Sequence, residues 1–391
     1  MDLGPLLARH PVVDGHNDLL WEARNQVGYD FDRLDVGGRT PTTHTDLPRL
    51  AAGGVGGQFW SVYVPTYLAG DAAVAATLEQ VDAARRLVDR YADRLALATT
   101  ADEVEAAWRS GRIASLLGAE GGHSIGCSLG TLRMLHALGV RYLTLTHNDN
   151  TPWADSATDV PAVGGLSAFG VEVVREMNRL GMLVDLSHVA ATTMRAALDA
   201  TEAPALFSHS SARAVTDHPR NVPDDVLERL PGNGGVCMVT FVPAFVNAEC
   251  AAWQLAMVEE TKRVGVAPDD AEGRSAFHAT WVRDHPEPPS RLDDVVAHCE
   301  HVRDVAGIEH VGLGGDYDGT PSLPSGLEDV TGYPRLLAAL ADRGWSEDDL
   351  ARLTCRNVLR VMRDAEQTAS RIAATRGPSL ATIEALDGAS V

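Results

Sequence analysis

Eight short apolar runs recur along the chain, each separated from the next by a loop or a stretch with helical spacing. They are Val12–Asp18, Gly57–Val64, Ile113–Glu120, Val140–His147, Met182–His188, Ala205–His209, Val236–Phe241 and His310–Asp316. Most are continuously apolar rather than alternating, which is typical of parallel strands covered on both faces. The pattern therefore predicts eight buried, parallel strands.

Helical patterns fill the segments between these runs. Asp71–Tyr91, Leu166–Leu180 and Ala190–Ala200 carry apolar residues three and four positions apart. Gly139 and Gly181 stand where glycines at helix C-termini are expected. An eightfold alternation of strand and helix predicts an α/β fold of the (β/α)8 TIM-barrel type, with an open α/β sheet as the alternative.

We expect this barrel to occupy residues 1–364 as one domain. One segment, Asn247–Arg291, interrupts its rhythm and is predicted to be a helical insertion that ends at a group of prolines: Pro286, Pro288 and Pro289. Residues 365–391 are rich in Ala, Thr and Ser and are expected to form a C-terminal helical or frayed tail.

Composition narrows the class of protein. The chain has 391 residues, 45% of them hydrophobic, and a net charge of −21, so nucleic acid is not an expected partner. No cationic leader or apolar stretch of membrane-spanning length is present in the sequence, and we expect a cytoplasmic protein with no membrane partner. Five cysteines without paired spacing favour reduced thiols: Cys127, Cys237, Cys250, Cys299 and Cys355.

Candidate chemistry lies at the ends of the apolar runs. Side chains of the types that bind metals end six of the eight runs: His16, Asp18, Glu120, His147, His188, His209 and Asp316. The C-terminal ends of barrel strands meet at one mouth, and burying so many polar groups is costly unless they share a cation. The set suits zinc or a similar divalent ion and is large enough for two ions.

Long blocks around these residues resemble the renal (membrane) dipeptidase family, peptidase family M19 of the amidohydrolase superfamily. The resemblance covers residues 10–363 and rests on these blocks: Asp14–Asp18, Gly57–Tyr63, Glu120–Ser124, Leu143–His147, Asn150–Asp155, Asp185–His188, Ser208–Ser211, Arg220–Asp225 and Gly314–Gly319. It implies a dinuclear zinc dipeptidase in which His16 and Asp18 bind the first Zn²⁺ and Glu120 bridges both ions. His188 and His209 would bind the second Zn²⁺.

The same resemblance implies three further roles. Asp316 would shuttle the proton of a metal-bridging hydroxide, His147 would stabilise the oxyanion, and Arg220 would bind the C-terminal carboxylate of the substrate. Xaa–Yaa dipeptides, including those with a D-residue in the second position, would be the substrates, and a homodimer the assembly. An ion pair of Arg220 with Asp224 or Asp225 is the structural alternative.

Two departures from the family leave substrate preference open. Thr240–Phe245 replaces an aromatic-rich stretch and lacks its tyrosine, and the insertion at 247–291 is longer than in the animal enzymes.

The sequence also allows three alternative functions. Gly122–Gly126 matches G-x-S-x-G, so a serine hydrolase using Ser124 is one alternative. Another amidohydrolase acting on a carboxylate-bearing amide or lactone is a second, and a non-catalytic metal-binding barrel is a third. We interpret His298 and His301 as part of a solvated helix face.

Overall fold

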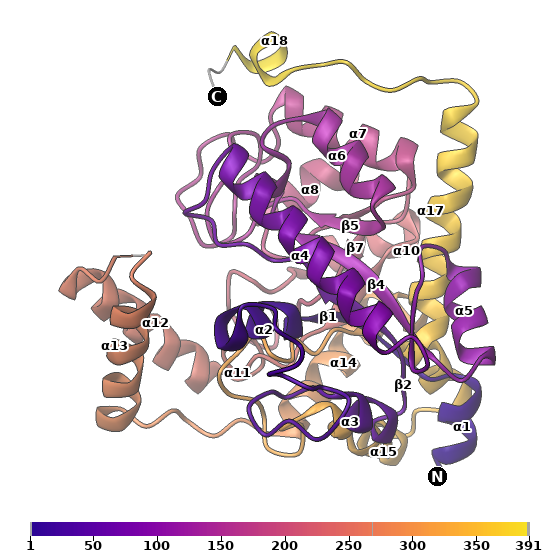
Figure 1. Cartoon of the computed structure of the whole chain (residues 1–391), viewed down its shortest axis with the longest axis vertical. Helices are drawn as coiled ribbons and strands as arrows, with labels where there is room; N and C mark the ends of the chain where they lie inside the picture. The colour runs from indigo at the N-terminus through magenta and orange to yellow at the C-terminus, as the bar shows by residue number, and fades with distance from the viewer. Residues whose placement is uncertain (1, 268, 389–391) are drawn as a thin grey trace.

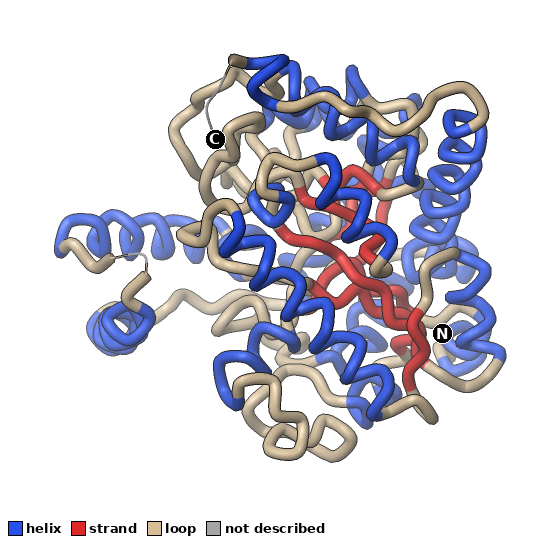
Figure 2. The backbone as a smooth tube through the Cα atoms, turned by 45° about the horizontal axis from the view of Figure 1, so that its top comes forward, coloured by secondary structure: helices blue, strands red, loops and turns tan. Residues whose placement is uncertain are grey.

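The computed structural model describes residues 2–267 and 269–388. Eight parallel strands close into a barrel at its centre, and helices surround them (Figure 2). Around the barrel the order is β2, β1, β9, β8, β7, β6, β5 and β4, and pairing of β2 with β4 closes the ring. These strands are β1 (Val12–Asn17), β2 (Val55–Ser61), β4 (Ile113–Glu120), β5 (Val140–Thr144), β6 (Leu183–Asp185), β7 (Leu206–Phe207), β8 (Val236–Val239) and β9 (Val311–Leu313). The predicted (β/α)8 barrel is confirmed.

Each predicted run coincides with or overlaps one of these strands, but β2 begins two residues before its run, at Val55, and several strands end earlier than predicted. In β6, β7 and β9 the polar residues that close the runs lie in the loops after the strands. One further strand, β3 (Leu95–Leu97), was not predicted, because three residues are too few to show a pattern. It pairs with the beginning of β4 on the edge that β5 occupies further along.

Most of the helices cover the outside of the barrel (Figure 1). They are α1 (Gly4–Arg9), α2 (Leu19–Val27), α3 (Leu47–Ala52), α4 (Asp71–Arg90), α5 (Ala101–Arg109), α6 (Leu129–Ala137), α7 (Ala168–Leu180), α8 (Ala191–Ala200), α9 (Asp224–Leu227), α10 (Leu230–Asn233), α11 (Pro243–Val246), α12 (Ala248–Val264), α13 (Ala271–Asp284), α14 (Leu292–Ala306), α15 (Tyr333–Asp342), α16 (Glu347–Ala351), α17 (Asn357–Ala373) and α18 (Ile383–Asp387). Helix α7 shows how local sequence sets the ends: the Ser167 side chain accepts from the Gly170 N–H, and Gly181 ends the helix in the left-handed region.

The predicted insertion is helical, and α12 and α13 stand away from the barrel at the left of Figure 1. Hydrogen bonds order the two ends of the insertion, which we call its base. Asn247 caps α12, and the Trp253 indole N–H donates to the His285 carbonyl at 2.7 Å.

His298 on α14 fastens this base to the barrel. Its Nδ1 accepts from the Ala212 N–H at 3.0 Å, and its Nε2 lies 3.2 Å from the Val246 carbonyl. The side chain is fully buried, so the interpretation of His298 as solvent-facing was wrong. Periodicity within α14 shows which residues share a face, but not that the loop at Ala212 and the segment ending at Val246 lie against it. His301 is partly buried and pairs with Asp224.

Helix α17 crosses the expected domain boundary at residue 364 without a break. It lies along α7 and α5, with Ala365 and Ile372 buried. The chain then runs in extended form to α18, at the top of Figure 1. Among the described residues, no helix combines the length and the apolar character needed to cross a lipid bilayer.

Candidate metal centre

The C-terminal mouth of the barrel gathers all seven predicted metal-type residues. Glu120 closes β4 and occupies the middle of the cluster. Its Oε2 lies 3.3 Å from His16 Nε2, whereas its Oε1 lies 3.0 Å from His188 Nε2 and 3.5 Å from His209 Nε2. One carboxylate therefore turns one oxygen toward each of two groups of ligands, which is the arrangement of a bridging ligand.

The first group is built from β1 and the loop after β9. His16 Nε2 lies 3.2 Å from Asp18 Oδ2 and 3.9 Å from Asp316 Oδ1. His16 and Asp18 are two positions apart at the end of β1, and the Asp316 backbone N–H donates to the His16 carbonyl. Three donor groups from distant parts of the chain thus converge at one point.

The second group is formed by imidazoles. His188 and His209 Nε2 atoms lie 3.0 Å apart, and His147 Nε2 lies 3.6 Å from Glu120 Oε1. The His147 and His188 rings are 4.2 Å apart. His147 therefore stands beside the same ion position as His188, close enough to contact either an ion or a substrate there.

Burial sets the charge of these groups. It lowers the pKa of His147, His188 and His209, so the imidazoles are neutral and their lone pairs are free to bind a cation. Burial has the opposite effect on carboxyl groups and raises the pKa of Glu120 and Asp316. Cations beside these carboxylates would stabilise their charged forms.

Unsatisfied atoms show that the cluster fits metal ions. Among the described residues, His16 Nε2 and Asp18 Oδ1 are buried and have no hydrogen-bond partner. Buried polar atoms are ordinarily paired, and both of these belong to residues of one potential metal-binding group. Nitrogen and oxygen donors in this number match zinc or a similar divalent ion.

Backbone strain coincides with the cluster. His188 and Asp316 have φ angles of 67° and 59°, in the left-handed region that side chains with a Cβ rarely adopt. Such strain persists where the surrounding structure enforces it, and it is concentrated at functional sites.

Two supporting side chains were not assigned from sequence. The Tyr142 hydroxyl lies 2.8 Å from His16 Nδ1, and the Ser61 hydroxyl donates to Glu120 Oε2 at 3.0 Å. Gly118 makes room for the tyrosine, since a Cβ at that position would lie 1.9 Å from the Tyr142 ring. Their position inside predicted strands was the only available signal.

Arg220 is buried near this cluster. None of its three guanidinium nitrogens has a hydrogen-bond partner among the described residues, and it lies over the Phe245 ring at 5.1 Å. Burial lowers its pKa to about 10, opposed by the charges of Asp316 and Glu120. An isolated guanidinium in such a place is a ready site for an anion.

The alternative pairing of Arg220 with Asp224 or Asp225 is wrong. Asp225 pairs with Arg195 at 2.7 Å, and Asp224 pairs with His301 at 2.8 Å.

The serine-hydrolase alternative is not supported either. Ser124 lies in a short 3-10 helix, and its hydroxyl is buried without a hydrogen-bond partner among the described residues. The neighbouring His123 ring is bound to the Val64 carbonyl instead. Within the described part of the chain, Ser124 therefore has no base bonded to it that could activate it.

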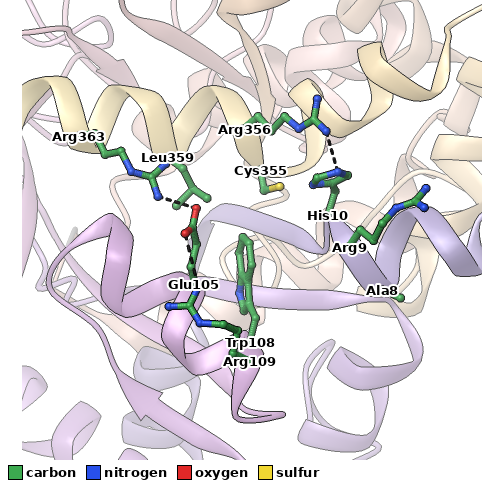
Figure 3. Close-up of a pocket in the computed structure, with 10 residues that line it drawn as sticks. All are labelled: Ala8, Arg9, His10, Glu105, Trp108, Arg109, Cys355, Arg356, Leu359 and Arg363. Carbon is green, nitrogen blue, oxygen red and sulfur yellow. Dashed lines mark hydrogen bonds and ion pairs between the residues drawn. The ribbon is translucent and has the colours of Figure 1, made fainter.

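A separate cavity of about 420 Å³ opens beside the start of β1 (Figure 3). Trp108 and Leu359 line it together with several arginines. These arginines already have partners: Arg363 pairs with Glu105 and Arg356 with Asp348. The cavity contains none of the clustered ligands and lies at the opposite end of the strands.

A closed α/β barrel with histidines and carboxylates converging at its C-terminal mouth has the architecture of a metal-dependent enzyme. The family model of the membrane dipeptidases (peptidase family M19) matches residues 2–376, and the chain belongs to this family. It is thus a metallopeptidase that hydrolyses dipeptides.

Similar proteins agree with this assignment. Dipeptidase verJ of Clonostachys rogersoniana is 42% identical over 381 residues, which cover 95% of this chain and 88% of that protein. The probable dipeptidase PvdM of Pseudomonas aeruginosa shares the fold, with a TM-score of 0.80, 22% identity and coverage of 93% and 98%. A metallopeptidase of Rhodobacter sphaeroides, liganded with a phosphinate mimic of L-Ala-D-Ala, has a TM-score of 0.75, 25% identity and coverage of 91% and 99%.

Proposed function

We propose that this dipeptidase is a dinuclear zinc enzyme for Xaa–Yaa dipeptides. The observation that carries the proposal is the placement of Glu120, whose Oε2 faces His16 and whose Oε1 faces the imidazoles of His188 and His209. His16 and Asp18 would hold the first ion, and His188 and His209 the second, with Glu120 shared between them.

Bound zinc would supply a water of lowered pKa, about 7, and would polarise the scissile carbonyl. The protein groups around it then have separate tasks. Asp316, at the edge of the cluster, takes up the proton of the attacking water and passes it to the leaving amine. His147 donates a hydrogen bond to the developing oxyanion, a contact of the kind that contributes about 3–4 kcal/mol.

Arg220 would select the substrate. A guanidinium binds a carboxylate through two parallel hydrogen bonds, and Arg220 has all of its donors free of protein partners among the described residues. A free carboxylate one residue beyond the scissile bond is the group that a dipeptide offers. The buried cation therefore favours dipeptides over longer peptides, and over amides or lactones that lack a carboxylate.

Acceptance of a D-residue in the second position is part of the proposal. Its support is the Rhodobacter sphaeroides metallopeptidase, whose bound ligand mimics L-Ala-D-Ala.

A dipeptide library of L,L and L,D stereochemistry, assayed with elemental analysis of the same sample, tests the proposal. We expect two zinc ions per chain and hydrolysis of both stereochemical series. Hydrolysis of carboxylate-bearing lactones, or of carboxylate-bearing amides other than dipeptides, at rates above those for dipeptides would favour the other amidohydrolase alternative.

We further propose a cellular compartment and an oligomeric state for the enzyme. All five cysteines are free, four of them buried, which agrees with a reducing compartment such as the cytoplasm. We also propose a homodimer, as the family implies, which light scattering of the purified protein would test.

A further inference from the structure

Three adjacent strand ends place a buried chain of hydrogen bonds behind His209. Asp185, the last residue of β6, stands between Thr144 at the end of β5 and Ser208 just after β7. The Ser208 hydroxyl lies 2.6 Å from Asp185 Oδ2 and 2.7 Å from His209 Nδ1. All of these side chains are buried.

Both carboxylate oxygens of Asp185 accept hydrogen bonds from identified donors. Its Oδ1 accepts from the backbone N–H groups of Ser187 and Ser208, at 3.1 and 2.8 Å. Its Oδ2 accepts from the Thr144 hydroxyl at 2.5 Å and from the Ser208 hydroxyl. A carboxylate has no proton to donate, so the hydrogen between Ser208 Oγ and Asp185 Oδ2 belongs to the serine.

This arrangement decides the tautomer of His209. A serine hydroxyl has one hydrogen, and Ser208 gives it to Asp185. The short contact with His209 then requires the imidazole to donate from Nδ1 to Ser208 Oγ. Its proton therefore lies on Nδ1, and the lone pair of Nε2 faces Glu120 Oε1 at 3.5 Å.

We propose that Asp185 and Ser208 are positioning residues that fix His209 in the tautomer that binds the second metal ion. This inference rests on the proposed function, in which His209 is a ligand of that ion. The packing keeps the serine in place: a Cβ at Gly15 or Gly314 would lie 2.3 or 1.9 Å from the Ser208 carbonyl oxygen.

The other imidazole of the second group has no such support. His188 Nδ1 is buried without a hydrogen-bond partner among the described residues. Of the two histidines proposed to bind the second ion, His209 is thus the one whose tautomer the protein fixes, through Ser208.

Two substitutions and a matched control test this role in the zinc-loaded enzyme. Ser208→Ala removes the acceptor of the imidazole proton. Asp185→Asn keeps the shape, but its amide would donate to Ser208 and turn the serine proton toward His209 Nδ1, which moves the imidazole proton to Nε2. Thr144→Val removes a hydroxyl from the same carboxylate oxygen but does not touch His209.

Zinc affinity, measured by competition with a chromophoric chelator, is the first readout. We expect Ser208→Ala and Asp185→Asn to weaken binding of one of the two ions by about 10- to 100-fold, as outer-shell changes do. We expect Thr144→Val to leave both affinities nearly unchanged. Equal losses in all three variants, or no loss in the first two, would overturn the inference.

The tautomer itself is the second readout and needs no variant. Nitrogen-15 spectra of the loaded wild-type enzyme should show the His209 proton on Nδ1, and a proton on Nε2 would contradict the inference. Failure of the proposed function looks different, because the wild-type enzyme would then bind fewer than two zinc ions.

Discussion

Arg220 is the residue whose surroundings say most about the substrate. A buried cation without a protein hydrogen bond is costly to maintain, and a substrate carboxylate offsets that cost. The Phe245 ring supports the guanidinium from one side and holds it in place for binding.

Arg220→Met should weaken hydrolysis of free dipeptides far more than hydrolysis of their C-terminal amides. Loss of charge-assisted hydrogen bonds, about 1.5–3 kcal/mol, corresponds to a fall in kcat/KM of about 10- to 100-fold. Steady-state kinetics on matched acid and amide pairs measures the difference. Arg195→Met, which removes a partly exposed arginine paired with Asp225, is the control and should change neither. An equal loss on acids and amides would remove Arg220 from carboxylate binding.

Asp316→Asn should separate proton transfer from metal binding. An amide cannot accept the proton of the attacking water, so we expect kcat to fall by about 10²- to 10⁴-fold. Metal content, measured by elemental analysis, should stay near that of the wild-type enzyme, because His16, Asp18 and Glu120 remain. A variant with unchanged kcat would show that another group carries the proton.

At the scale of elements, α11, which directly precedes the insertion, is joined to α14 and the barrel through buried polar contacts. His298 bonds both to the loop at Ala212 and to α11 at Val246, and α11 carries Phe245, which contacts Arg220. The insertion thus begins directly after the element whose Phe245 contacts Arg220, the residue proposed to bind substrate.

His298 gives this junction a pH dependence. Burial lowers its pKa to about 4, from an ordinary value of 6.5. Above pH 6.5 the imidazole is neutral in both folded and unfolded chains. Between about pH 6.5 and 4 only the unfolded chain takes up the proton, so the free energy of unfolding falls as the pH falls, by up to about 1.4 kcal/mol per pH unit.

His298→Asn should therefore flatten part of the acid dependence of stability. We expect the stability advantage of the wild type over the variant to shrink between pH 6.5 and pH 5, measured by urea denaturation. A difference that stays constant over this range would show that His298 does not remain neutral in the fold.

The sequence patterns predicted the barrel strands, but they did not predict how individual side chains are packed. Continuous apolar runs located all eight barrel strands, since burial on both faces leaves a clear pattern. The three residues of β3 left none. The environments of His298 and Arg220 depend on segments distant in the chain, so no local pattern could show that both are buried.

In the candidate site, too, the positions of residues at strand ends could be predicted, but the contacts behind them could not. Ligands such as Glu120 and His209 were predicted because they end strands that meet at one mouth. Asp185 and Ser208 lie inside the same blocks, yet their roles depend on side-chain distances of less than 3 Å, which only the structure provides.

At the scale of the whole molecule, the barrel and the cluster depend on each other. Eight strands bring carboxylates and imidazoles together, and cations beside them would relieve the cost of burying these groups. Binding of an ion to the folded chain alone stabilises it, by about 2.7 kcal/mol when the ion is present at 100 times its Kd.

Removal of metal by a chelator should abolish dipeptide hydrolysis and lower Tm, and added zinc should restore both. Calorimetry and activity assays on the same sample provide the measurement. Full activity in a sample shown to be free of metal would contradict the metallopeptidase mechanism.

The central claim, two ions shared through Glu120, is tested most directly by an anomalous difference map collected at the zinc absorption edge. The account predicts two peaks about 3.5–4 Å apart at the barrel mouth, each within bonding distance of one Glu120 oxygen. A single peak, or two peaks that do not both contact Glu120, would contradict it.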